Sequence, residues 1–102
     1  MTGRRQILAA AAVAVLAFSV SGCEKLKARD QLNRGVAQFR SARYADAVEH
    51  FKQAVELDPK FPTARLYLAT AYMSQYIPGA DSPENMQMAQ AAHDQFQKVL
   101  SQ

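Results

Sequence analysis

Apolar side chains recur every three or four positions along most of this chain, which is the period of an amphipathic α-helix and not of a strand. The recurrence forms four stretches: Leu32, Gly35, Val36 and Phe39; Ala47, Val48, Phe51, Ala54 and Val55; Leu66, Ala69, Tyr72 and Met73; and Met88, Ala92, Phe96, Val99 and Leu100. The sequence therefore predicts an all-α fold.

Proline-containing breaks separate these stretches. Asp58-Pro59 ends the second stretch, Pro62 suits the first turn of a third helix, and Pro78-Gly79 ends that helix. Ser82-Pro83-Glu84 combines an N-cap, a first-turn proline and an acidic residue at the positive end of a helix. We expect four helices, near residues 26–41, 44–57, 62–76 and 83–101.

The second stretch carries a specific series, Tyr-x2-Ala-x3-Phe-x2-Ala-x4-Pro, formed by Tyr44, Ala47, Phe51, Ala54 and Pro59. A small residue at Ala47 lets two antiparallel helices approach closely, and Phe51 fills the gap between them. Ala54 leaves room for a neighbouring unit, and Pro59 ends the helix.

This series resembles the second helix of a tetratricopeptide repeat (TPR). Gly35 stands twelve residues before Ala47, where the small residue of that repeat's first helix belongs. A second repeat begins at Pro62, and its matching residues are Leu68, Ala69, Tyr72, Ala92, Phe96 and Val99. The first helix departs from the family pattern, because Arg34 and Gln38 stand where the family prefers Leu and Tyr.

The resemblance implies two antiparallel helix pairs of the α-solenoid type, over residues 28–61 and 62–102. The small residues of the second repeat, Ala69 and Ala92, are 23 residues apart and not twelve, so we place an eleven-residue insertion between its two helices, around Tyr76 to Ser82. This repeat also stops before its closing proline. The alternative fold is an unrelated four-helix bundle.

Residues 1–22 have the organisation of a secretory signal peptide. Arg4 and Arg5 are followed by an apolar run from Ile7 to Phe18 and then by small residues. The run is shorter than the roughly 20 residues that span a membrane. Arg4-Arg5-Gln6-Ile7-Leu8 also resembles the twin-arginine export pattern, although paired arginines in signal peptides more often supply only positive charge.

Val20-Ser21-Gly22-Cys23 resembles the bacterial lipobox. The resemblance implies transfer of a diacylglycerol, with fatty acyl chains such as palmitate, to Cys23 and cleavage before it, leaving residues 23–27 as a lipidated tether. Cys23 is the only cysteine, so it has no intramolecular disulfide partner. We expect an exported lipoprotein on the periplasmic side of a membrane (the outer membrane in a Gram-negative source) or at the cell surface. The alternative is an ordinary signal peptide with a chance cysteine.

Charge and site chemistry exclude several functions. The chain has a net charge of +3, but loss of Arg4 and Arg5 leaves ten basic and nine acidic residues, so we expect no nucleic-acid partner. We also expect no catalytic residues, no metal and no cofactor, since His50 and His93 lack further ligands at metal spacing and no phosphate-binding loop is present. Both histidines are predicted to be solvated. The methionines Met73, Met86 and Met88 favour a core position, with an adaptable binding surface as the alternative.

TPR proteins bind peptides or proteins on the concave surface of their first helices, so the resemblance implies an interaction module held at a membrane. The candidate binding residues are Arg29, Leu32, Val36, Phe39, Arg40, Leu66, Thr70 and Met73. Basic residues dominate the first helix and acidic residues the second, which predicts attraction between the two helices or, alternatively, contact with anionic headgroups. Exposed apolar residues on the last helix suggest self-association. Two different interpretations are a fragment of a longer TPR lipoprotein and, less favoured, a small envelope enzyme or metal carrier.

Overall fold

The computed structural model describes residues 22–102, which form helices and connecting turns without a strand. The first helix covers residues 22–40, followed by α2 (Tyr44–Leu57), α3 (Pro62–Gln75) and α4 (Pro83–Leu100). The predicted all-α fold is confirmed, and the first helix includes residues before the expected start at residue 26. Residues 1–21, and with them nearly all of the predicted signal peptide, lie outside the described residues.

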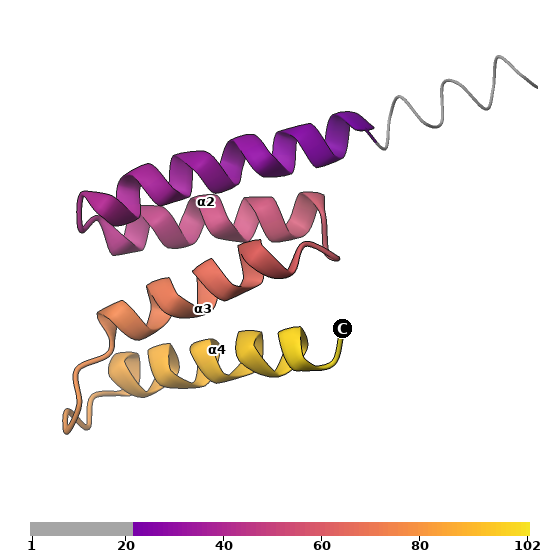
Figure 1. Ribbon diagram of the computed structural model, residues 1–102. Helices are drawn as coiled ribbons and strands as arrows, with labels where there is room; N and C mark the ends of the chain where they lie inside the picture. Colours follow the sequence, from indigo (N-terminus) through magenta and orange to yellow (C-terminus); the bar gives the residue numbers. More distant parts are fainter. Residues whose placement is uncertain (1–21) are drawn as a thin grey trace, which may run out of the picture.

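The four helices stack in chain order, and each runs antiparallel to the one before it (Figure 1). The packing is that of paired TPR helices, so the predicted arrangement is confirmed. The core lies where α2 and α3 meet and consists of Ala47, Val48, Phe51, Leu68 and Ala71. The first helix contributes Leu32, Val36 and Phe39, which are half-buried against this cluster.

The turn between the first helix and α2 is closed by two backbone hydrogen bonds. Arg43 N donates to Gln38 O at 2.9 Å, and Ala42 N donates to Phe39 O at 3.0 Å. This is the Schellman arrangement, whose central residue adopts a left-handed conformation and is usually glycine. Here Ala42 has that conformation, with φ 58°.

The two repeats can be aligned by adding a fixed number to the residue numbers of the first. For the first helix of each repeat this offset is 34 residues, which aligns the small residues Gly35 and Ala69. For the second helix the offset is 45 residues, which aligns Ala47 with Ala92. Gly35, Ala47, Ala69 and Ala92 are all buried. The offsets therefore match positions that have the same packing role.

The insertion in the second repeat is divided between a loop and a helix. The loop covers residues 76–82, whereas the turn in the first repeat covers only residues 41–43. α4 also starts nine residues before Ala92, whereas α2 starts three residues before Ala47. The expectation that the whole insertion lies between the helices is therefore corrected: part of it lengthens α4, because Ser82 and Pro83 start that helix early.

Ser82 caps α4 as predicted, since its Oγ accepts a hydrogen bond from Asn85 N at 3.2 Å. The Asn85 side chain then fixes the loop. Its Oδ1 accepts from Ile77 N at 2.6 Å, and its Nδ2 donates to Ile77 O at 2.7 Å and to Ala80 O at 2.9 Å. Asn85 is buried, and its three hydrogen bonds add to the backbone bond that Ala80 N donates to Ile77 O at 3.2 Å.

Within residues 22–102, no helix has the length and apolar character needed to cross a membrane.

Candidate functional site

The structure divides the candidate residues of the first helix into two groups. The apolar residues Leu32, Val36 and Phe39 are half-buried against the core. The Phe39 ring also contacts the Tyr44 ring edge-on, with 5.1 Å between centroids. These three side chains therefore serve packing, and only part of each remains open to a ligand.

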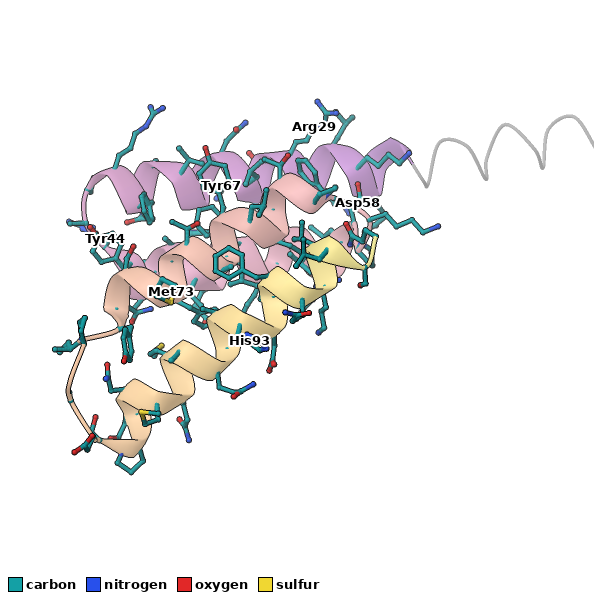
Figure 2. The ribbon with its side chains drawn as sticks, turned by 60° about the horizontal axis from the view of Figure 1, so that its bottom comes forward. Arg29, Tyr44, Asp58, Tyr67, Met73 and His93 are labelled. Atoms are coloured by element: carbon teal, nitrogen blue, oxygen red, sulfur yellow. The ribbon has the colours of Figure 1, made fainter. Side chains whose placement is uncertain are left out.

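Arg29 and Arg40 are exposed. Arg29 points away from the α3–α4 pair in Figure 2. The ion pairs within residues 22–102 all join residues of the same helix, among them Arg34 with Asp30 at 3.0 Å. The basic first helix and the acidic α2 are therefore not joined by an ion pair within this part of the chain.

The candidate residues of α3 form an open surface. Leu66 is 43% exposed and Met73 is 44% exposed, and Thr70 lies between them with its Oγ1 donating to Leu66 O at 2.8 Å. A shallow pocket of about 190 Å³ lies on this face, lined by Thr63, Leu66, Tyr67 and Thr70. Figure 2 shows Tyr67 and Met73 on this helix. These residues offer apolar contact area without charge.

A larger groove of about 510 Å³ lies between α2, α3 and α4, and no sequence pattern indicated it. Arg65 lines it, donating through Nη1 to Gln95 Oε1 at 3.0 Å and through Nη2 to Pro59 O at 3.3 Å. The Arg65 guanidinium thus ties α3 to α4 and to the end of α2. Because these two hydrogen bonds join three helices, we assign Arg65 a structural role; its Nε is buried without a partner among the described residues.

The histidine prediction is wrong for His50. Its Nδ1 lies 2.8 Å from Gln31 Oε1, and the imidazole is half-buried between the first helix and α2. The reason is that helix pairing brings Gln31 across from His50. His93 is exposed. No cluster of three His, Cys, Asp or Glu side chains suited to a metal ion occurs among residues 22–102.

The methionine prediction is wrong for two of three residues. Met73 and Met86 are exposed, while Met88 is half-buried. Helical spacing alone could not separate them, because it identifies an apolar face without showing whether another helix covers that face. Asn85, which organises the loop before α4, was also missed, since a single asparagine after a helix cap has no distinguishing sequence signal.

Cys23 is an exposed free thiol near the start of the described chain. It is followed by exposed Lys25, Leu26 and Lys27. This segment is helical and accessible, so a group attached at Cys23 would not disturb the core.

In a comparison with protein families, a family model described as a TPR repeat matches residues 35–75. The match begins at Gly35 and extends through α2 and α3, so it contains the core and the open face of α3. The match supports the interpretation of this chain as a tetratricopeptide repeat protein. No curated protein and no solved structure matched the chain.

Proposed function

We propose that this protein is a membrane-anchored interaction module of the bacterial cell envelope, which holds a protein or peptide partner on the surface of its TPR helices. The observation that carries the proposal is the open face of α3, where Leu66 and Met73 are exposed within a region that matches a TPR repeat. TPR repeats commonly bind protein or peptide partners. Large exposed apolar side chains grouped on one face commonly mark such interaction sites.

The proposed anchor is a diacylglycerol on Cys23. Support comes from the lipobox-like Val20-Ser21-Gly22-Cys23 and from the exposure of the Cys23 thiol. Each buried CH2 of an acyl chain contributes about 0.8 kcal/mol, so two chains on one residue give stable anchoring. The exposed Lys25, Lys27 and Arg29 next to the anchor would lie near anionic headgroups and add to the attraction.

A second candidate is that the folded part belongs to a longer TPR lipoprotein whose downstream region carries the function. The observation that favours it is the exposure of Phe96 and Leu100 on α4, where a solenoid would place a further repeat. The intact mass of the endogenous protein separates the two proposals. A polypeptide that ends at Gln102 favours the self-contained module, and a heavier one favours the longer lipoprotein.

Site-specific photo-crosslinking in living cells tests the interaction. A photoreactive phenylalanine analogue is placed at Met73, on the open face of α3, and in a matched strain at Gln53, an exposed residue of α2. We expect a discrete protein adduct from position 73 in the membrane fraction and none from position 53. Equal labelling from both positions, or no adduct from position 73, would contradict the proposal.

A further inference from the structure

The first repeat shows which kind of helix packs on its helix pair. α3 lies against α2, and the ring of Tyr67 on α3 stacks on the buried ring of Phe51, with centroids 5.3 Å apart and planes inclined by 29°. Leu32, Val36 and Phe39 of the first helix and Val55 of α2 pack against the same cluster. One helix, α3, therefore completes the burial of residues from both helices of the pair.

The corresponding residues of the second repeat are not covered. The offset of 34 residues relates Leu32, Val36 and Phe39 to Leu66, Thr70 and Met73, which are exposed. The offset of 45 relates Phe51 and Val55 to Phe96 and Leu100. Phe51 is fully buried, whereas Phe96 is 37% exposed and Leu100 is 79% exposed. We name this surface the α3–α4 face, defined by Leu66, Thr70, Met73, Phe96 and Leu100.

From this correspondence we infer that the α3–α4 face is the docking site for one helix of another protein, and that this helix has the chemistry of α3. The inference rests on the proposed interaction function and specifies its partner. α3 contacts its neighbours through small residues and one leucine, Ala64, Leu68 and Ala71, and presents Tyr67 to an aromatic ring. The docked helix is accordingly one with alanines at helical spacing and an aromatic residue that stacks on Phe96.

The charge pattern agrees with such an occupant. The five residues of the α3–α4 face are uncharged, and α3 itself, the helix docked in the first repeat, contains one charged residue, Arg65. An acidic or basic peptide would form no ion pair with the five residues of this face, and its charged groups would lose hydration there. The partner helix is therefore expected to be nearly uncharged on its contact side.

A second copy of this chain does not supply the required helix. In the described part of the chain, the contact residues of α3 are already buried: Ala64 and Ala71 are fully buried, and Leu68 is 2% exposed. The apolar side chains of the first helix and α2 are likewise packed against the shared core. If two copies met through their α3–α4 faces, two helices would lie where the first repeat accommodates one.

The test supplies an α3-type helix in the register that the offsets define. Leu57, which ends α2, corresponds to Gln102, so a copy of residues 58–75 is joined directly after Gln102 in the full chain, purified in mild detergent. The matched control carries the same residues 62–75 in scrambled order. Thermal unfolding is followed by circular dichroism, and two differently tagged copies of the unmodified full chain are co-expressed to report self-association.

We expect the appended copy to raise the melting temperature by about 5 °C or more over the scrambled control. Phe96→Asp should abolish that increase, whereas Leu26→Asp, an exposed leucine on the first helix, should not. We also expect the two tagged copies not to co-purify. If the appended copy does not raise the melting temperature, the inference about the docked helix is wrong. A protein adduct at position 73 would still support the proposed interaction function, so the two experiments can fail independently.

Two further results would overturn the choice of occupant. Co-purification of the tagged copies that Phe96→Asp abolishes would make a second copy the occupant. An endogenous protein that continues past Gln102 into a helix with the contact residues of α3 would make the occupant intramolecular.

Discussion

Gly35 on the first helix and Phe51 on α2 pack so closely that a Cβ on Gly35 would lie 2.5 Å from the ring carbon Cδ1 of Phe51 and 3.1 Å from Cζ. Phe51 is fully buried, and its ring also stacks on that of Tyr67. The ring therefore has little freedom to move away. This contact sets the distance between the first two helices.

Gly35→Ala should destabilise the protein, although alanine is the better helix former. Alanine gains about 1 kcal/mol of helix propensity, but overpacking a filled core costs about 1–3 kcal/mol. We expect a net loss measured by urea unfolding. The double variant Gly35→Ala with Phe51→Leu should lose less than the sum of the two single changes, because leucine leaves room for the new methyl group; strict additivity would show that the two residues do not compete for space.

Phe51 and Phe96 occupy corresponding positions, and their truncation should have unequal effects. Phe51→Ala removes a fully buried aromatic ring and should cost about 3–5 kcal/mol, enough to unfold most of so small a domain. Phe96→Ala should cost less than half as much, because its ring is partly exposed and no helix covers it. Circular dichroism melts of both variants provide the comparison, and similar losses would show that the Phe96 ring is packed as fully as that of Phe51.

The sequence was sufficient to predict the helices because proline and capping residues mark their ends and the apolar period marks their faces. It predicted that Phe51 fills the space between the first two helices, and that Gly35 is the small residue of the first helix, because small and aromatic residues have distinct roles in packing helix pairs. The direct contact between Gly35 and Phe51 is shown by the structure. It did not predict that Met73 and Met86 are exposed, since exposure depends on whether a further helix is present. The hydrogen bonds of His50 and Asn85 also depend on three-dimensional contacts that no local pattern specifies.

Asn85→Ala should loosen the loop over residues 76–82. The substitution removes the side-chain partner of Ile77 N, Ile77 O and Ala80 O, while Ile77 O keeps its hydrogen bond from Ala80 N at 3.2 Å. Each intramolecular hydrogen bond that is lost contributes about 0.5–1.5 kcal/mol to stability. We expect lower stability and faster proteolysis within the loop. Gln87→Ala, at an exposed position of the same helix, serves as the control, and equal proteolysis of both variants would refute the role of Asn85.

Ala42→Gly should stabilise the protein. Ala42 has φ 58°, a left-handed conformation that costs a residue with a Cβ about 1–2 kcal/mol and costs glycine little. Part of this gain is offset by the greater freedom of glycine in the unfolded chain, so we expect a net gain of about 0.5–1 kcal/mol. Ala37→Gly, at an exposed position inside the first helix, should instead lose about 1 kcal/mol. Denaturation midpoints that move in the same direction for both variants would contradict the left-handed conformation of Ala42.

Anchoring at Cys23 is the premise on which the envelope role depends, and Cys23→Ser should leave the protein uncleaved or released from the membrane. The most direct measurement is intact-mass and peptide mass spectrometry of the wild-type protein isolated from membranes. We predict a mature chain that begins at Cys23 with a thioether-linked diacylglycerol on its sulfur. A mature chain in which Cys23 carries an unmodified thiol would contradict the proposed anchor.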